Sequence, residues 1–230
     1  FSAQYGRNEV WQDYEVVSHD FINDASGNVT FAGSGIVQAG EDSPLGGYAA
    51  DFGSHAVRNY IAATIASLPD YSLQIWFKPA SVSATAGGSD IVNINNTGGT
   101  AETSLLQDYD PNLYGMYNAP DGWLRSTSAP AVGVWRKLTT TAQDTTRTFK
   151  VDGAQESTSS IGVEATNRTQ LFVGSRLSAL SSWWATGLAA ELRIRRSGIS
   201  TAWDLAEYQN QSAASNWGTV GAWADAGGAP

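Results

Sequence analysis

The sequence predicts an all-β protein, with two antiparallel sheets packed as a sandwich and one short helix near the C-terminus. Three observations point to this fold class. Apolar and polar residues alternate with a period of two in several segments, as in strands with one buried face. Turn-forming pairs rich in Gly, Asn and Asp separate these segments. The 230 residues are 42% apolar and only 15% charged, which suits many strands joined by polar turns in one large domain.

The clearest strand is YSLQIWFKP, residues 71–79. Its alternate apolar side chains share one face: Tyr71, Leu73, Ile75 and Phe77. Trp76 falls on the opposite, polar face, where it either packs under the helix or lines a concave face.

A second alternating strand, GLAAELRIRR, covers residues 187–196. Strict alternation predicts one inward set, Leu188, Ala190, Leu192 and Ile194. Residues 135–141 and 169–175 are further strand candidates, because they are rich in β-branched and aromatic residues.

A hairpin is predicted at Asp152-Gly153, after a segment in which Arg147, Phe149 and Val151 share a side. A two-residue type I′ turn needs positive φ twice, which Asp-Gly supplies. Phe149, Trp135 and Trp11 are expected in the core.

One helix is predicted over residues 200–211, STAWDLAEYQNQ. Ser200 or Thr201 caps its start, and Asp204 lies near the positive end of the helix dipole. We expect Trp203 and Tyr208 to pin this helix to the sandwich.

The charge and composition exclude several classes of partner. A net charge of −9 with only 13 dispersed Lys and Arg argues against nucleic acid and anionic membranes. There is no Cys, so disulfides and thiolate chemistry are absent. No apolar run approaches about 18 residues, so no membrane insertion is expected. The chain starts at Phe1 without Met or a basic segment, and we interpret it as a domain cut from a longer protein with neighbouring domains, whose remainder would contain any signal peptide.

Several motifs occur in a defined order along almost the whole chain: VWQDYEVVSHDF, DASGNV, YAADFG, YSLQIWFKP, WRKLTTTAQD, FKVDG, LFVGS and GLAAELRI. This series resembles the laminin-G-like, concanavalin A-like jelly rolls of bacterial and phage surface proteins. The tail EYQNQSAASNWGTVG is similar to the ending of one bacterial and phage subgroup. The resemblance implies a single jelly-roll domain over residues 1–230. Two departures stand out: Ala190-Glu191 replaces an Asp-Glu pair, and residues 53–59, GSHAVRN, replace an acidic loop.

The fold alone does not identify a function. The glucanase branch of this fold carries carboxylates at alternate positions of one strand, and no Glu-x-Asp-x-Glu occurs here. Asp108 and Asp110 are the nearest pair, but Pro111 follows at once. His19 and His55 are interpreted as ordinary strand and loop residues without catalytic partners. The sequence therefore predicts no enzyme, although a lyase with scattered Tyr, Arg and His would escape this test.

Nine Trp and nine Tyr offer flat faces on which sugar rings stack, with nearby amides and carboxylates to hold hydroxyl groups. Residues 108–126 and an adjacent tryptophan pair hold the best candidates. The predicted ligand-binding residues are Tyr114, Tyr117, Asn118, Asp121, Trp123, Trp183 and Trp184. For Tyr114 the alternative is ordinary strand packing. Adjacent residues of an extended segment point opposite ways, so one of Trp183 and Trp184 is expected inside and the other outside.

The resemblance also implies a structural Ca²⁺ between an early turn and the last strand. Asp24, before the turn at residues 26–28, and Glu191 match those places. Backbone carbonyls would supply most of the six to eight oxygens that Ca²⁺ requires. The alternative for Glu191 is a simple ion pair with Arg193 on the same face.

Our hypothesis is therefore a non-catalytic carbohydrate-binding or adhesion module of a bacterial or phage surface protein, including a phage receptor-binding role. Its partner would be a glycan or cell-surface polysaccharide, and its place would be extracellular, on a cell or a virion. Two alternatives remain: a structural module that decorates a virion or adhesin, and a polysaccharide hydrolase or lyase.

Overall fold

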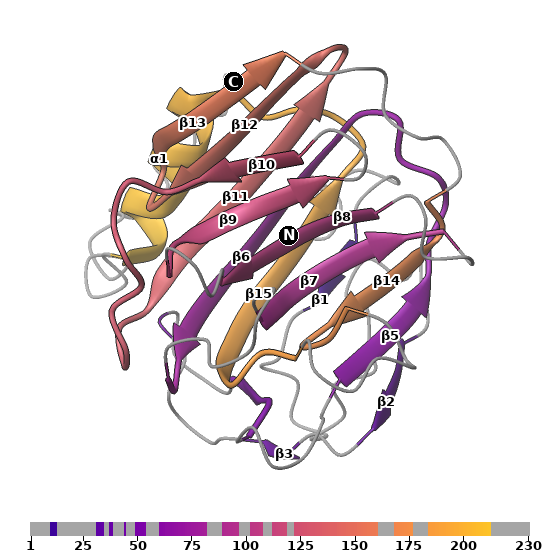
Figure 1. Cartoon of the computed structure of the whole chain (residues 1–230), viewed down its shortest axis with the longest axis vertical. Helices are drawn as coiled ribbons and strands as arrows, with labels where there is room; N and C mark the ends of the chain where they lie inside the picture. Colours follow the sequence, from indigo (N-terminus) through magenta and orange to yellow (C-terminus); the bar gives the residue numbers. More distant parts are fainter. Residues whose placement is uncertain are drawn as a thin grey trace, which may run out of the picture.

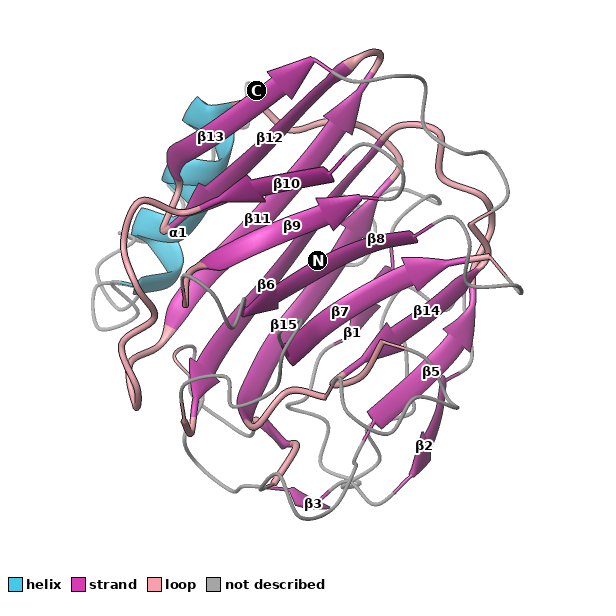
Figure 2. Cartoon of the chain, in the orientation of Figure 1, coloured by secondary structure: helices cyan, strands magenta, loops and turns pink. Residues whose placement is uncertain are grey.

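The computed structural model describes residues 10–12, 31–34, 37–38, 44, 49–53, 60–81, 89–96, 102–107, 112–118, 122–160, 168–176 and 184–212. In this part of the chain two antiparallel sheets lie face to face, and one helix lies outside them (Figure 1, Figure 2). The predicted two-sheet sandwich with one C-terminal helix is confirmed.

The eight-stranded sheet has the order β13-β12-β11-β6-β15-β4-β3, and β1 pairs with β15 beside this path. Its strands are β1 (Val10–Gln12), β3 (Val37–Gln38), β4 (Ala50–Asp51), β6 (Tyr71–Pro79), β11 (Arg136–Gln143), β12 (Thr146–Val151), β13 (Ala154–Ser160) and β15 (Gly187–Arg195).

The seven-stranded sheet has the order β10-β9-β8-β7-β14-β5-β2. Its strands are β2 (Phe31–Ser34), β5 (Tyr60–Thr64), β7 (Ser89–Asn95), β8 (Glu102–Gln107), β9 (Tyr114–Asn118), β10 (Gly122–Arg125) and β14 (Gln170–Val173).

The core lies between the two sheets. The predicted inward face of β6 is confirmed, since Tyr71, Leu73, Ile75 and Phe77 are each at most 1% exposed. Facing them from the other sheet are apolar side chains such as Leu105 and Val173. Every residue from Tyr71 to Phe77 is buried, because the helix covers the outer face of this strand.

The predicted hairpin joins β12 and β13. Asp152 (φ 53°) and Gly153 (φ 77°) both adopt the left-handed conformation that a type I′ turn requires. Phe149 lies fully in the core, as predicted, whereas Trp135 is only partly buried. The side chain of Trp11 lies outside the described residues.

The alternation of β15 is interrupted, so the predicted inward set is only half right. Ala189 pairs with Phe77 and faces the core, which places Leu188 and Ala190 on the outer face. A β-bulge follows at Glu191, whose φ of 53° is unusual for a residue with a side chain. The extra residue shifts the phase by one, so Ile194 returns to the core as predicted.

Helix α1 (Thr201–Ser212) confirms the helix prediction. Ser200 caps it, accepting a hydrogen bond from the Trp203 N–H on Oγ (3.1 Å). Trp76 packs under the helix, where its Nε1–H donates to Gln211 and its ring stacks on Tyr208. Trp203 is 56% exposed, and its ring contacts the sheet through a cation–π contact with Arg195 of β15 (5.9 Å to the centroid), so the prediction that it pins the helix is only partly right.

Candidate functional site

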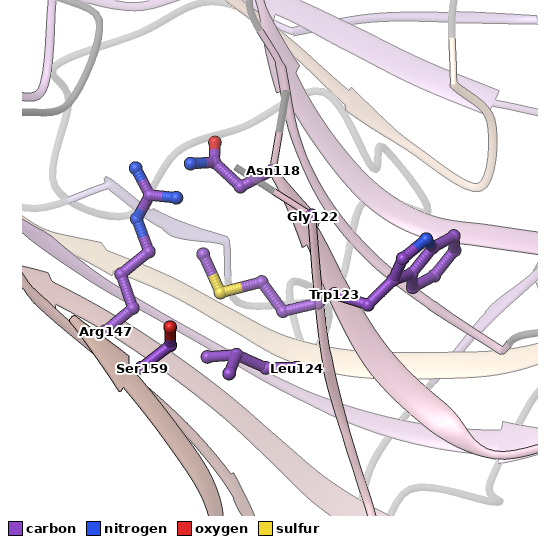
Figure 3. Close-up of a pocket in the computed structure, with 7 residues that line it drawn as sticks. Asn118, Gly122, Trp123, Leu124, Arg147 and Ser159 are labelled. Atoms are coloured by element: carbon purple, nitrogen blue, oxygen red, sulfur yellow. The ribbon is translucent and has the colours of Figure 1, made fainter. Parts of the chain in front are cut away.

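The outer face of the seven-stranded sheet carries an aromatic pair at its β10 edge. Tyr117 of β9 and Trp123 of β10 are direct cross-strand partners, with ring centroids 4.9 Å apart and planes tilted by 47°. Both side chains are half-buried. Figure 3 shows Trp123 pointing away from the interior, on the opposite side of its strand from Leu124 and Asn118. Two of the predicted ligand-binding residues thus form one aromatic platform.

The backbone around this platform explains how the indole is held. The guanidinium carbon of Arg125 lies 4.6 Å from the Trp123 ring centroid, in a cation–π contact. Gly115 is the cross-strand partner of Arg125, and a Cβ there would lie 3.7 Å from Trp123 and 2.9 Å from the Leu124 carbonyl oxygen. The absence of a side chain at position 115 therefore lets β10 and the indole approach β9 closely. Sequence reasoning missed Arg125, although its i+2 spacing from Trp123 was visible.

Tyr114 and Asn118 do not belong to this platform, because they point into the sandwich. Tyr114 is 2% exposed, and burial raises the pKa of its phenol. Asn118 accepts hydrogen bonds from the buried Arg168 guanidinium (2.5 Å) and from the Thr103 hydroxyl (3.1 Å). Because both side chains are buried, neither can contact a ligand at the surface. Tyr114 therefore packs in the strand, which was the alternative to ligand binding.

A small cavity lies behind the platform, between the edges of the two sheets. Its volume is about 10 Å³, room for one water molecule, and Asn118, Leu124, Arg147 and Ser159 are among its lining residues (Figure 3). Arg147 of β12 is 2% exposed and points inward, as its predicted alternation with Phe149 requires. This cavity is too small for a sugar ring, so a glycan would bind outside the sandwich.

The remaining predicted ligand residues lie elsewhere. Trp184 is half-buried and forms an isolated antiparallel bridge with Ser175. Its buried Nε1–H has no hydrogen-bond partner among the residues that the structure describes. Trp183 and Asp121 lie outside the described residues, so the opposite orientation of the two tryptophans stays a prediction.

An open groove of about 480 Å³, which the sequence did not predict, crosses the outer face of the eight-stranded sheet. Lys78, Leu188 and Asp51 form its floor as cross-strand neighbours on β6, β15 and β4. The segment around Val132 and Gly133 forms a wall, tied by the Gly133 N–H to the Pro79 carbonyl (2.9 Å). Leu188 reaches this floor only because the bulge reverses the phase of β15.

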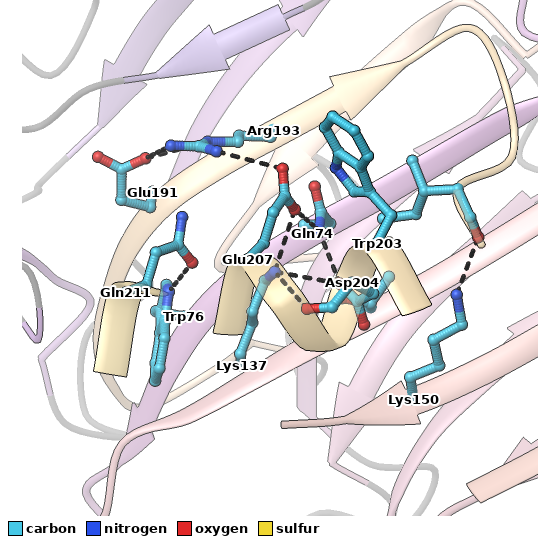
Figure 4. Close-up of polar contacts among 12 residues, drawn as sticks. Gln74, Trp76, Lys137, Lys150, Glu191, Arg193, Trp203, Asp204, Glu207 and Gln211 are labelled. Carbon is cyan, nitrogen blue, oxygen red and sulfur yellow. Dashed lines mark hydrogen bonds and ion pairs between the residues drawn. The ribbon is translucent and has the colours of Figure 1, made fainter. Parts of the chain in front are cut away.

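A dense polar cluster fills the space between helix α1 and the same outer face (Figure 4). Asp204 is fully buried, and its Oδ1 accepts hydrogen bonds from Gln74 (2.8 Å) and Thr139 (2.9 Å) and an ion pair from Lys137 (3.1 Å). Glu207 lies between Lys137 (3.2 Å) and Arg195 (2.5 Å). Burial alone would raise the pKa of Glu207, but Lys137, Arg195 and the Gln74 hydrogen bond lower it to about 2.

Glu191 lies at the rim of this cluster. Its Oε2 accepts two hydrogen bonds from Arg193, at 3.2 and 3.0 Å, which is the ion pair considered as the alternative to metal binding (Figure 4). Among the described residues, no three His, Asp or Glu side chains gather into a metal site. Asp24 lies outside the described part, so calcium binding stays a prediction that depends on backbone carbonyls.

The remaining candidates for catalysis are two carboxylates and two histidines. Asp108, Asp110, His19 and His55 all lie outside the described residues. The two carboxylates of helix α1, Asp204 and Glu207, are paired with Lys137 and Arg195. In the described segments, none of the helices has the length and apolar character needed to span a membrane.

Comparison with solved structures finds the same fold in binding domains. Domain 4 of an extracellular arabinanase from Geobacillus stearothermophilus, solved with arabinotriose, is 18% identical with a TM-score of 0.66, covering 86% of this chain and 96% of that one. The binding domain of a paraclostridial mosquitocidal protein is 16% identical with a TM-score of 0.63, covering 87% of this chain and 52% of that one. A structure of botulinum neurotoxin type C, whose cell entry depends on interaction with two ganglioside molecules, is 10% identical with a TM-score of 0.64, covering 92% of this chain and 53% of that one.

A search of the curated proteins found no match. The family model of the concanavalin A-like lectin/glucanases superfamily matches residues 55–202, well over half of the chain. This match, together with the two-sheet sandwich and its structural neighbours, shows that the chain belongs to the concanavalin A-like lectin/glucanase superfamily.

Proposed function

We propose that this domain is a non-catalytic glycan-binding module of an extracellular protein, on a bacterial or virion surface, and that Tyr117 and Trp123 form its contact platform. The observation that carries the proposal is this cross-strand aromatic pair, half-exposed on the outer face of β9 and β10. Sugar rings present C–H groups that stack on such faces, and rigid aromatic side chains lose little entropy on binding.

The structural neighbours support a binding role over a catalytic one. The arabinanase domain was solved with an arabinotriose, and the neurotoxin structure concerns recognition of gangliosides. These relatives share the fold at low identity, so the ligand of this domain has to be read from its own residues.

The platform predicts shallow, weak binding that gains strength from repeated sites. It lies on an open sheet face, and the cavity behind it holds no more than one water molecule. An open face buries only part of a sugar, so affinity per site is limited, and several copies on one surface would add avidity.

The test is a glycan and polysaccharide array probed with the wild-type domain, followed by the Tyr117→Ala/Trp123→Ala variant on every glycan retained. We expect the variant to lose retention by at least about tenfold, because both stacking faces are removed. Trp203→Ala is the matched control, since it removes a 56% exposed tryptophan from the opposite side of the sandwich.

Two outcomes would contradict the proposal. If the wild-type domain retains no glycan, the domain is a structural module instead. If the double variant folds, as shown by an unchanged near-UV spectrum, and still retains the glycan, the site lies elsewhere.

A further inference from the structure

Helix α1 packs on the sheet with polar side chains and leaves apolar side chains exposed. Its buried residues are the polar Asp204 and Gln211, whereas Trp203 and Leu205 are 56% and 38% exposed. An ordinary surface helix presents its apolar stripe to the protein and its polar side to water. The attachment of α1 thus depends on ion pairs and hydrogen bonds, with one aromatic stack between Tyr208 and Trp76.

The sheet surface under this helix is strongly cationic. Four cations lie on it: Lys137, Lys150 and Arg195 are buried, and the Arg193 side chain is 14% exposed. Within the described cluster, the helix meets them with two carboxylates, and Glu191 of the sheet pairs with Arg193. We call the set Gln74, Trp76, Lys137, Arg193 and Arg195 the helix-covered face. Without the helix, this face would present cations around an indole, on an otherwise acidic chain.

The cost of lifting the helix is lower than for an apolar interface. The groups that would be uncovered are charged or polar, and water solvates them well. The desolvation of both charges offsets part of the attraction in each ion pair, so the pairs hold the helix less strongly than their Coulomb energy alone would. The helix is also C-terminal to all strands, so its release breaks no strand pairing.

Two adjacent helix residues define what the helix-covered face recognises. The Glu207 carboxylate is held by Arg195 (2.5 Å), Gln74 (2.6 Å) and Lys137 (3.2 Å). The neighbouring Tyr208 ring stacks on Trp76, with centroids 5.7 Å apart and planes inclined by 27°. Figure 4 shows this carboxylate among Gln74, Lys137 and Arg193. A uronic acid residue combines the same features, a ring that stacks on indole and a carboxylate attached to it.

We infer that the helix-covered face is a second binding site, specific for uronate-containing acidic polysaccharides, and that helix α1 occupies it as an internal competitor. This site lies on the opposite sheet from the Tyr117–Trp123 platform and does not depend on it. Binding would require release of α1, so the apparent affinity of the resting domain is reduced by the small fraction in which the helix is detached.

The experiment compares two proline variants of the full chain. Ala206→Pro places proline at an exposed position in the helix interior, where it breaks the helix without deleting a contact with the sheet. Thr201→Pro is the matched control, because the first helical position accepts proline. The probe is a heptamer of galacturonic acid at low ionic strength, measured by calorimetry beside a neutral galactose heptamer.

We expect Ala206→Pro to bind the galacturonate heptamer at least about tenfold more tightly than the wild type and Thr201→Pro, with no gain for the neutral heptamer. Adding Arg195→Gln to Ala206→Pro is expected to remove the gain, whereas adding Tyr117→Ala/Trp123→Ala leaves it intact. The variant that combines Ala206→Pro with Tyr117→Ala/Trp123→Ala tests this site without the platform. The proposal for this site and the proposal for the platform can therefore be contradicted independently.

The inference is overturned if amide exchange shows a melted helix in Ala206→Pro and galacturonate affinity stays at the wild-type value. It is also overturned if poly-glutamate binds as tightly as the uronate heptamer, since the face would then recognise acidic peptides. Should Ala206→Pro disturb the sandwich, the wild type gives the second test. Saturating heptamer must accelerate amide exchange in residues 201–212, because competition is reciprocal. Unchanged exchange there contradicts the inference.

Discussion

The two outer faces of this sandwich are both built from the non-core positions of their strands, yet they differ in how their polar groups are used. On the eight-stranded sheet, Lys137 and Arg195 are 2% and 7% exposed, because α1 supplies Asp204 and Glu207 to them. On the seven-stranded sheet, Tyr117 and Trp123 stay half-exposed at the edge strand. The covered face is held by its internal partner, whereas the open face leaves its aromatic side chains accessible.

The largest expected effect comes from breaking the covered face at Asp204. Asp204→Ala removes a carboxylate that Lys137, Gln74 and Thr139 all contact, and it leaves Lys137 buried with less compensation. We expect the helix to lose about 3 kcal/mol of docking free energy, seen as roughly hundredfold faster amide exchange in α1. Equal exchange in Asp204→Ala and the wild type would show that the cluster does not hold the helix.

Acid should weaken the covered face and leave the open face unchanged. The Glu207 pKa falls from its usual 4.5 to about 2 in the folded chain, so its stabilising effect is complete above pH 4.5 and is lost as the pH falls toward 2. The full effect is about 3 kcal/mol. Amide exchange of α1 against pH measures it, and Glu207→Gln should flatten this dependence. An unchanged slope in that variant would assign the acid sensitivity to other groups.

Alanine substitutions at two glycines distinguish the cost of backbone strain from the cost of a clash with helix α1. Gly153→Ala forces a side chain into a left-handed turn, and its Cβ would lie 2.5 Å from the Leu205 Cα. Gly133→Ala meets the same strain at φ 74° with no atom within 4 Å. We expect Gly133→Ala to lower the free energy of unfolding by about 1 kcal/mol and Gly153→Ala by at least about 2 kcal/mol. Urea denaturation measures both, and equal losses would mean that the turn does not press on the helix.

Calcium is expected to have the smallest effect. Because Arg193 already takes Oε2 of Glu191, we expect EDTA to change the melting temperature by less than about 2 °C. If EDTA lowers the melting temperature by more than this, and Glu191→Gln abolishes the difference, Glu191 is a metal ligand. Scanning calorimetry in Ca²⁺ and in EDTA provides the measurement.

Local sequence patterns predicted most of the fold. Alternation located β6, and the Asp152-Gly153 pair located the β12–β13 turn, because each signal is confined to a few neighbouring residues. The bulge at Glu191 escaped prediction, since no glycine or proline marks it and its effect is a change of phase. The inverted helix escaped for a different reason. Its carboxylates pair with Lys137 of β11 and with Arg193 and Arg195 of β15. These contacts are tertiary, so the periodicity of the helix sequence does not predict them.

The candidate site was predicted in part. Tyr117 and Trp123 come together because β9 and β10 pair in register, while the same register turns Tyr114 and Asn118 inward. With the ends of β9 known, alternation alone would have assigned Tyr117 to one face of the strand and Tyr114 and Asn118 to the other. The 480 Å³ groove had no local signal, because its floor joins residues 51, 78 and 188 from three strands.

The left-handed residue in the middle of β15 marks the one place where this strand can lose a residue without changing its faces. Glu191 and Leu192 together lie opposite Ile75, so deleting Glu191 would remove the bulge and leave Ala189 and Ile194 facing the core as they do now. A one-residue deletion elsewhere in β15, with the bulge kept, would exchange the faces of all side chains on one side of it. We therefore expect length changes during evolution to be tolerated at the bulge and not in the two flanking halves of the strand.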